Sequence, residues 1–352
     1  MKALVLRDVG QIKIEDIPKP SPKQGEVLVH VKACGICGSD IPRAYKDGAH
    51  RMPLVIGHEF AGEVAEIGDG VDPQWIGRRV GVFPLIPCKE CECCKNRKYE
   101  MCKNYSYLGS RRDGGFAEYV LVPEWNLIEI PKAVDFEEAA MLEPMAVAVH
   151  AIRHADPHMN DVVCVMGLGT IGLLTVMFLK EAGCKNILAI GNKESQREKV
   201  LEMGIPADDY CDSKMWDVKS WIAEKTGGHG VDIFFECIGK NESVSLGIDL
   251  AAPSGKVCLV GNPHSDMELD RAIYWKILRN QLTLVGTWNS SYTWDKDDDW
   301  HYVIEALKRG RVKPAQLITH KFPLSDILEG FEIMRDKSEE YVKVMGEVGE
   351  VE

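Results

Sequence analysis

The sequence predicts an α/β protein of two domains, a β-rich domain and a doubly wound domain with a parallel sheet. The chain has 352 residues, which is enough for two domains that each bury a core. Residues 1–130 are rich in Gly and Pro and contain short alternating apolar stretches such as EVLVHVKA and GEVAEIG, which are typical of short strands and turns. From about residue 136, apolar strands alternate with amphipathic helices, as in a parallel sheet covered by helices.

The elements of the parallel sheet can be placed one by one. We expect strands at DVVCVMG, NILAIG, DIFFECIG, KVCLVG and LTLVGTW, with a weak sixth strand near Asp209–Cys211. We expect helices at FEEAAMLEPMAVAVHAIRHA, TIGLLTVMFLKEAG, ESQREKVLEMG, MWDVKSWIAEKTG and RAIYWKILRN. The segment after about residue 290, which includes a helix at WHYVIEALKRG, is too short to form a third domain. We expect it to pack with the first domain. The β-rich domain is therefore expected at 1–146 and 290–352, and the doubly wound domain at 147–289.

Composition excludes two classes of partner. The net charge of −12 and a pI near 5.4 argue against a nucleic-acid-binding protein, because such a protein needs a basic surface to displace phosphate counterions. No window reaches the roughly 18 apolar residues of a membrane helix, and the N-terminal sequence lacks the pattern of a signal peptide. We therefore expect a cytoplasmic protein with a small-molecule partner and no membrane contact.

A glycine-rich turn, GLGTIG, follows the strand DVVCVM and begins the helix TIGLLTVMF. This is the context of a Rossmann dinucleotide-binding turn. In such a turn, Gly167 permits the tight bend, Gly169 lets the backbone approach the pyrophosphate, and Gly172 packs helix against strand. The N–H groups of Thr170 and Ile171 would point at the phosphates. The sequence thus predicts a site for NAD(H) or NADP(H); the alternative is a glycine turn in an unrelated α/β protein.

The end of the second strand bears on the choice between the two cofactors. An acid at this place binds the ribose 2′-hydroxyl of NAD and repels a 2′-phosphate. Here the sequence reads AIGNKESQR, with Gly191 in place of the acid, and Asn192, Lys193 and Arg197 follow. Because the two cations could accept a phosphate charge, we favour NADP(H). The alternative is that both cations are solvated and Glu194 replaces the acid from a shifted position.

Five of the twelve cysteines lie between residues 88 and 102, in PCKECECCKNRKYEMC. They are too close for separate disulfides, and the segment has too few apolar residues for a core of its own. The spacing CxxCxxCx7C predicts a tetrahedral structural zinc with no open position, held by Cys88, Cys91, Cys94 and Cys102. Cys93 is then a free surface thiol, or it substitutes in another register.

A second, dispersed set consists of Cys37 in GICGSD, His58 and Glu59 in GHEF, and Glu143 in MLEPMAVAVHA. Together with GGFAEY, GLGTIG and KILRNQLTLVG, these motifs resemble the zinc-containing medium-chain dehydrogenases in order and spacing over essentially the whole chain. The resemblance implies a GroES-like catalytic domain split around a Rossmann domain, an active site in the cleft between them, and a homodimer or homotetramer. Glu143 stands where liver-type alcohol dehydrogenases have a cysteine, which makes the chain similar to the polyol dehydrogenase branch.

The resemblance also implies a catalytic zinc, the second of two per chain, held by Cys37, His58 and either Glu59 or Glu143. Such a zinc lowers the pKa of a substrate hydroxyl, from which hydride passes to the nicotinamide. Ser39 is placed to relay the proton. It could also cap a helix that begins at SDIPRAY, and the two roles are compatible.

Three longer stretches, CGSDIPRAYKDGAH, GSRRDGGFAEY and KILRNQLTLVGTWNSSYTW, resemble members of the family that act on a polyol phosphate. We therefore expect oxidation of a secondary hydroxyl of a galactitol 1-phosphate-like substrate to the ketose phosphate. The phosphate needs cations, and Arg43 is favoured among five basic residues expected near the cleft mouth, Arg43, Lys46, Arg51, Arg111 and Arg112. The alternatives are a dehydrogenase for an unphosphorylated polyol or secondary alcohol, of sorbitol or butanediol type, and a non-catalytic zinc- and nucleotide-binding protein on the same fold.

Overall fold

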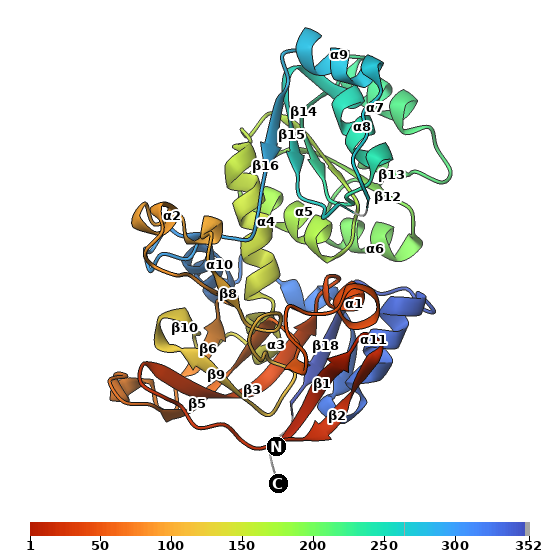
Figure 1. Cartoon of the computed structure of the whole chain (residues 1–352). Helices are drawn as coiled ribbons and strands as arrows, with labels where there is room; N and C mark the ends of the chain where they lie inside the picture. The colour runs from red at the N-terminus through yellow and green to blue at the C-terminus, as the bar shows by residue number, and fades with distance from the viewer. Residues whose placement is uncertain (264, 349–352) are drawn as a thin grey trace. The chain divides into compact units, whose positions relative to one another are not determined.

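The computed structural model describes residues 1–263 and 265–348, which form two compact units (Figure 1). Unit 1 comprises Met1–Glu143 and Ser291–Glu352, and unit 2 comprises Pro144–Ser290. The first boundary falls inside a helix, α4 (Leu142–Ala155), so that Glu143 in its first turn belongs to unit 1. No helix among the described residues is long and apolar enough to cross a bilayer.

Unit 1 is built from short strands that are mostly antiparallel. They are β1 (Lys2–Asp8), β2 (Gln11–Asp16), β3 (Glu26–Ile36), β4 (Leu54–Val55), β5 (Glu59–Ile67), β6 (Arg79–Val82), β7 (Leu85–Ile86), β8 (Ser106–Tyr107), β9 (Tyr119–Pro123), β10 (Leu127–Glu129), β17 (Ile318–Pro323) and β18 (Lys343–Glu347). The largest sheet has the order β10-β6-β5-β3-β18-β17, and β9 also pairs with β3. The smaller sheets are β2-β1-β4 and β7-β8. The apolar side chains of EVLVHVKA are buried, on both faces of β3 at 27–29, as suits a strand at the centre of the large sheet.

Short helices join these strands. They are α1 (Asp40–Pro42), the π-helical turn η1 (Arg43–Asp47), α2 (Glu92–Lys95), α3 (Phe136–Ala140), α10 (Asp299–Lys308), α11 (Ile327–Asp336), and the 3-10 turns η2 (Pro73–Trp75), η3 (Tyr99–Met101), η4 (Glu124–Asn126), η6 (Pro314–Leu317) and η7 (Leu324–Asp326). The acidic segment at 295–300 begins α10, because the Asp298 carboxylate accepts a hydrogen bond from His301 N at 2.8 Å. The C-terminal segment returns to the sheet, where β18 pairs with β3 and places Gly346 opposite Cys34.

Unit 2 contains one six-stranded parallel sheet with helices against it (Figure 1). Its elements are β11 (Val162–Met166), α5 (Thr170–Glu181), β12 (Asn186–Gly191), α6 (Glu194–Glu202), η5 (Ala207–Asp209), β13 (Tyr210–Asp212), α7 (Val218–Thr226), β14 (Val231–Glu236), α8 (Asn241–Leu250), β15 (Ala251–Leu259), α9 (Arg271–Arg279) and β16 (Thr283–Gly286). The strand order is β13-β12-β11-β14-β15-β16, so the order reverses between β11 and β14. In such sheets, ligands bind at the carboxyl ends of the strands beside this reversal.

Two helical segments differ from the sequence prediction. The segment 136–155, expected as one helix, forms α3 and α4 with a break at Met141, because Pro144 has no N–H to donate and fits only in a first turn. The sequence pattern does not predict α8, whose residues NESVSLGIDL have low helix propensity. Gly247 lets this helix approach the sheet, since a Cβ there would lie 2.7 Å from Cδ1 of Phe234.

Candidate metal centres and dinucleotide site

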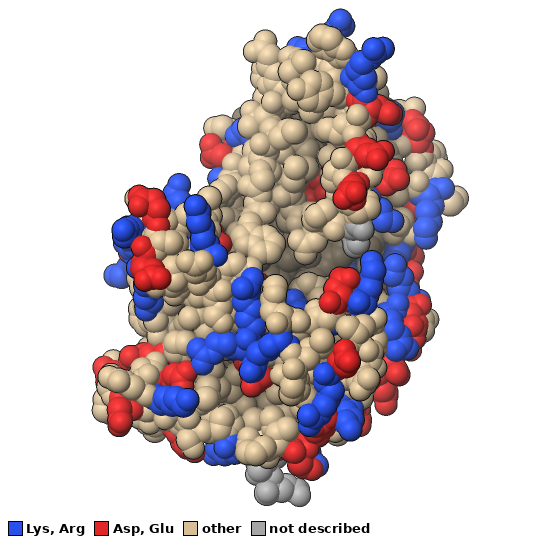
Figure 2. Space-filling view, in the orientation of Figure 1, with Lys and Arg blue, Asp and Glu red and all other residues tan. Residues whose placement is uncertain are grey.

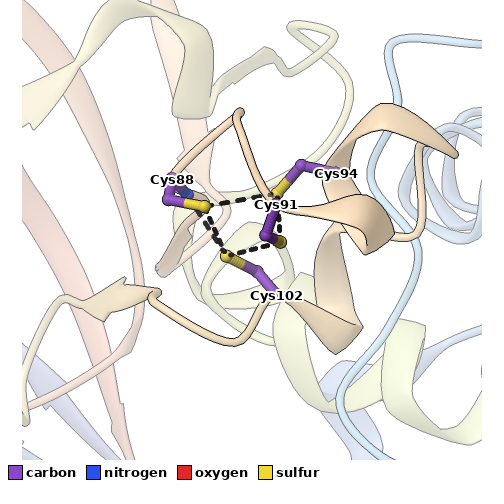
Figure 3. Close-up of side chains that lie close together, drawn as sticks. All are labelled: Cys88, Cys91, Cys94 and Cys102. Atoms are coloured by element: carbon purple, nitrogen blue, oxygen red, sulfur yellow. Dashed lines mark hydrogen bonds between the residues drawn. The ribbon is translucent and has the colours of Figure 1, made fainter.

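Four cysteine side chains of the segment 88–102 converge on one point (Figure 3). The sulfur–sulfur distances are 3.4 Å between Cys88 and Cys102, 3.5 Å between Cys91 and Cys94, and 3.9 Å for both Cys88–Cys94 and Cys91–Cys102. A tetrahedron of four Zn–S bonds of about 2.3 Å requires sulfur separations of about 3.8 Å. The geometry therefore fits a four-coordinate zinc with no open position.

Backbone N–H groups favour the thiolate form of two of these cysteines. Hydrogen bonds from the backbone of Cys94 and Lys103 lower the pKa of Cys91 to about 6, and similar bonds lower the pKa of Cys88. Burial instead raises the pKa of Cys94, so that this sulfur needs the charge of a metal to stay ionised. Cys93 is partly exposed and lies outside the four-sulfur set.

Cys37, His58 and Glu59 form the second cluster. Cys37 directly follows β3, and His58 and Glu59 stand at the start of the neighbouring strand β5. Because Glu59 is paired with Gly35 across the two strands, all three side chains come to one end of the sheet. One ligand atom from each lies within 4.8 Å of the other two, a spacing that could hold a metal ion.

Asp40 orients the histidine of this cluster. Its buried carboxylate oxygen Oδ1 lies 3.4 Å from His58 Nδ1, which is buried and has no well-formed hydrogen bond. Asp40 also accepts a hydrogen bond from Cys37 N at 3.0 Å and pairs with Arg43. A carboxylate that faces the outer nitrogen of a metal-binding histidine fixes the ring and leaves its other nitrogen for the metal. Nε2 of His58 is therefore the nitrogen available to a cation.

Ser39 lies at the N-cap position of α1, but its side chain makes no capping hydrogen bond. Its hydroxyl instead donates to Cys37 Sγ at 3.2 Å. The Ser39 side chain is thus directed at the cluster of Cys37, His58 and Glu59. A residue that relays the substrate proton would have to lie at this place.

Glu143 lies beside the cluster rather than within the 4.8 Å group. Its buried carboxylate accepts a hydrogen bond from the Tyr107 hydroxyl at 3.2 Å, and the Tyr107 ring packs edge-on against His58 with 5.7 Å between ring centroids. Burial and the charge of Glu59 raise the pKa of Glu143 to about 7, against the opposing charge of His58. Tyr107 therefore connects Glu143 to the other candidate ligands.

The cluster brings together four acidic groups, Cys37, Asp40, Glu59 and Glu143, of which Asp40 pairs with Arg43 and Glu59 with Lys343. Burial alone would lower the pKa of His58, but the charges of Asp40 and Cys37 raise it well above its usual range. Burial, Glu143 and Cys37 likewise raise the pKa of Tyr107. A divalent cation would offset this charge, and a set of one cysteine, one histidine and a carboxylate suits zinc with a position left for substrate.

Lys343 also lies in the cluster, although it belongs to none of the motifs of the sequence. It stands in β18, is buried, contacts the Glu59 carboxylate and donates to Ile36 O at 3.0 Å. Its one sequence signal is a lysine within the otherwise apolar stretch YVKVMG.

The glycine-rich turn joins β11 to α5 in unit 2. Gly167 has φ +96°, and a Cβ there would lie 2.5 Å from Ile238 Cγ1. A Cβ on Gly172 would lie 2.0 Å from Gly167 O, whereas Gly169 faces open space. The turn is thus closed on the protein side and open at the N-terminus of α5, formed by Thr170 and Ile171, as the approach of a pyrophosphate requires.

The space beside Gly191, at the end of β12, is already filled. A Cβ there would lie 2.8 Å from both Gln196 Oε1 and the Tyr210 hydroxyl. An acidic side chain could occupy this position only if one or both of these groups moved.

The residues after Gly191 line the start of α6. Asn192 is exposed, and Lys193 immediately precedes the helix. Arg197 Nη1 pairs with Glu194 Oε1 at 3.0 Å, and both side chains are well exposed. The Arg197 guanidinium is therefore paired with a carboxylate that could compete with a cofactor phosphate for it.

The five basic residues considered as ligands of a substrate phosphate differ in their ion-pair partners and in their exposure. Three form ion pairs, Arg43 with Asp40, Arg51 with Asp113 at 2.7 Å, and Arg112 with Glu26 at 2.6 Å. Lys46 is exposed in η1, and Arg111 lies in the turn that follows β8. Arg43, favoured from the sequence, is thus bound to the carboxylate that orients His58.

Comparison with known proteins identifies the family. The alcohol dehydrogenase GroES-like domain model matches residues 23–132, and the zinc-binding dehydrogenase model matches residues 170–309. Galactitol 1-phosphate 5-dehydrogenase of Escherichia coli K12 is 34% identical over 325 residues, 91% of this chain and 92% of that protein. The chain belongs to the zinc-containing medium-chain dehydrogenase family. The GroES-like and Rossmann architecture predicted from the sequence is confirmed.

Solved structures and a second relative show how far the similarity of this dehydrogenase extends. The crystal structure of the Escherichia coli galactitol-1-phosphate dehydrogenase matches with a TM-score of 0.92 and 32% identity, covering 99% of this chain and 100% of that chain. Sorbitol dehydrogenase of Halalkalibacterium halodurans is 32% identical over 353 residues, 98% of each protein.

Two similar solved structures contain a nicotinamide cofactor. A zinc-binding dehydrogenase from Sinorhizobium meliloti 1021 is bound to NADP (29% identity, TM-score 0.90), and an rspB alcohol dehydrogenase from Escherichia coli CFT073 is complexed with NADH (31% identity, TM-score 0.89). Each match covers 99% of both chains. The present dehydrogenase is therefore a zinc-dependent oxidoreductase that uses NAD(H) or NADP(H), as the sequence predicts.

Proposed function

We propose that this dehydrogenase oxidises a secondary hydroxyl of a polyol phosphate to the ketose phosphate, with transfer of hydride to NADP⁺. The observation that carries the proposal is the set of Cys37, His58, Glu59 and Glu143, in which a carboxylate rather than a second cysteine would complete a metal site. The relative named for galactitol 1-phosphate supports a phosphorylated polyol as substrate.

The residues of unit 1 have separate tasks in this proposal. Cys37, His58 and either Glu59 or Glu143 would hold the catalytic zinc, and Asp40 would keep the His58 ring in place. When bound, zinc supplies a Lewis acid that lowers the pKa of the substrate hydroxyl. The Ser39 hydroxyl, which lies 3.2 Å from Cys37 Sγ, would accept the substrate proton and pass it towards solvent.

The preference for NADP(H) rests on the end of β12. Gly191 stands where an acid would bind a ribose 2′-hydroxyl, and Gln196 and Tyr210 occupy the space beside it. We assign the pyrophosphate to Gly167, Gly169, Thr170, Ile171 and Gly172, and the 2′-phosphate to Gly191, Asn192, Lys193 and Arg197.

An unphosphorylated polyol is the second candidate substrate. It is favoured by the sorbitol dehydrogenase relative, which matches over 98% of both chains rather than 91%. The same zinc ligands and proton relay would serve either substrate, so the two candidates differ only in how the far end of the polyol is recognised.

Three further assignments complete the proposal. Residues 1–146 and 290–352 would act as the catalytic domain and residues 147–289 as the dinucleotide-binding domain, which the unit boundaries at Glu143 and Ser290 support. By its family, we expect the enzyme to be a homodimer or homotetramer, and we expect it to work in the cytoplasm.

A substrate panel tests the proposed function. We would measure kcat/KM for galactitol 1-phosphate, galactitol, sorbitol and 2,3-butanediol with NAD⁺ and with NADP⁺, with and without added zinc. We expect galactitol 1-phosphate with NADP⁺ to give the highest value, and activity to require zinc. Equal or better use of the unphosphorylated alcohols would overturn the polyol phosphate assignment.

A further inference from the structure

The loop that carries Arg111 is pressed against the backbone next to His58. Gly109 and Gly114 lie on either side of Arg111 in this loop. A Cβ on either glycine would lie 2.4 or 2.0 Å from the carbonyl oxygen of Gly57, the residue before His58. Such close packing leaves the loop little freedom to move relative to the candidate zinc ligand.

The same loop begins with a tight turn that places Tyr107 in the metal cluster. The N–H groups of Arg111 and Arg112 both donate to Tyr107 O, at 2.8 and 2.9 Å. The Tyr107 hydroxyl donates to Glu143 Oε1 at 3.2 Å. One turn therefore places the Tyr107 side chain among the candidate zinc ligands and the Arg111 guanidinium on the ring of Tyr105, which lies 6.2 Å from the ring of Tyr107.

Arg111 has no carboxylate partner among residues 1–263 and 265–348, whereas its neighbours Arg51 and Arg112 are each paired with one. Its guanidinium stacks on Tyr105, with Cζ 4.5 Å from the ring centroid, and its Nε is buried without a hydrogen-bond partner. Arg111 also borders a cavity of about 310 Å³, which is lined by Arg51, Arg112 and Asp113 as well but by none of the candidate zinc ligands. A buried N–H without an acceptor costs free energy, which a ligand oxygen can recover.

Several basic side chains lie around Arg111, and three of them, Arg43, Arg51 and Arg112, are each paired with a carboxylate. Burial and the charges of Arg111 and Arg43 lower the pKa of His50. Figure 2 shows Lys and Arg side chains gathered on the face of unit 1 near β9. A ligand anion that reaches this group of side chains would therefore pair with Arg111, since the other three arginines are already engaged.

We propose that Arg111, rather than Arg43, is the specificity-determining residue that binds the phosphate group of the substrate. The proposal rests on the proposed function, in which the substrate is a polyol phosphate. A guanidinium offers two parallel N–H donors that match two phosphate oxygens, and stacking on Tyr105 holds that fork in one plane. Arg43, Arg51 and Arg112 are each already neutralised by a carboxylate.

Steady-state kinetics on two matched substrates test this assignment. We would compare galactitol 1-phosphate with galactitol in the wild type, Arg111→Gln, Arg111→Lys, and Arg78→Gln as a control that removes an exposed arginine of unit 1 paired with Glu129. We expect Arg111→Gln to lower kcat/KM about 30-fold or more for the phosphate ester and no more than about twofold for galactitol. Arg111→Lys should fall between, and Arg78→Gln should match the wild type. The zinc content of every variant is measured in parallel, because a variant that keeps the zinc content of the wild type has kept the folded metal sites.

Inorganic phosphate separates the two ways in which the idea can fail. We expect it to compete with galactitol 1-phosphate in the wild type and to lose this inhibition in Arg111→Gln. Equal losses on both substrates, or inhibition that persists in Arg111→Gln, would overturn the role of Arg111 and leave the polyol phosphate assignment intact. A wild type that prefers unphosphorylated polyols overturns the proposed function, whereas inhibition by phosphate that depends on Arg111 would still place the anion site there.

Discussion

Lys343 and Glu59 form a buried ion pair beside the candidate catalytic ligands. Their side chains are 1% and 3% exposed. Burial alone would lower the pKa of Lys343, but the charges of Glu59 and Cys37 raise it, so the lysine stays charged. Gly35 makes room for the pair, since a Cβ there would lie 2.5 Å from Lys343 Cε and 2.6 Å from Glu59 Oε2. An internal cation therefore already engages one of the two glutamates proposed as zinc ligands.

Replacing the lysine alone should be more harmful than replacing both partners. Lys343→Met leaves the Glu59 carboxylate buried without its partner, and we expect a loss of about 3–5 kcal/mol in the free energy of unfolding. In the double variant Lys343→Met, Glu59→Gln the unpaired charge is gone, so at least half of this loss should be recovered. Urea unfolding of the zinc-loaded proteins measures both. If the double variant lost as much free energy of unfolding as the two single variants lose together, the pairing of Lys343 with Glu59 would be contradicted.

The two glutamates should contribute unequally to zinc binding. Because Lys343 engages Glu59, whereas Glu143 has the neutral Tyr107 hydroxyl as its hydrogen-bond partner in the described part of the chain, we predict that Glu143 is the direct ligand. Glu59→Gln should then weaken the catalytic zinc about 10- to 100-fold, as outer partners of a ligand do, and Glu143→Gln should weaken it more. Zinc content after dialysis against graded chelator concentrations gives the order. The reverse order would make Glu59 the direct ligand.

The cysteine lobe should depend on its metal for order. Cys94→Ser removes one of four sulfurs, and we expect it to lose one zinc per chain and to make the segment 88–102 sensitive to trypsin, which cleaves after its lysines and arginine. Cys93→Ser is the matched control, because this neighbouring thiol lies outside the set. Metal analysis and limited proteolysis should find two zinc ions and a resistant lobe in the control. Loss of zinc in Cys93→Ser and not in Cys94→Ser would show that the other register is used.

The features that the sequence predicts best are local. The glycine turn and the cysteine lobe depend on spacings within 16 residues or fewer, and the backbone at these places follows from residue type, as the positive φ of Gly167 illustrates. The strands of unit 2 are also predicted, because their apolar runs are long and bounded by turns. The helix α8 is missed because packing of Gly247 on Phe234, rather than helix propensity, decides it.

Contacts between distant segments could not be predicted in this way. Lys343 and Glu59 are 284 residues apart, and no motif connects them. The ranking of the arginines also depends on such contacts, since Glu26 pairs with Arg112 across 86 residues, while the neighbouring Arg111 pairs with no carboxylate of the described residues. From residue type alone, Arg111 and Arg112 are equally good candidates to bind a phosphate. The sequence does not show which of them is paired with a carboxylate.

The substitution Glu194→Gln distinguishes the two interpretations of the cofactor site, in which Lys193 and Arg197 bind the 2′-phosphate of NADP(H) or Glu194 binds the ribose of NAD(H). Glu194 pairs with Arg197 at 3.0 Å, so its removal should release this cation and take a negative charge from the place proposed for the 2′-phosphate. We expect kcat/KM with NADP⁺ to rise about threefold, which is the scale of an exposed charge pair, with little change for NAD⁺. If Glu194 instead accepts the ribose hydroxyl of NAD, the same variant should lower kcat/KM for NAD⁺ and leave NADP⁺ unimproved. Glu198→Gln, an exposed acid one turn further along α6, is the control and should change neither value.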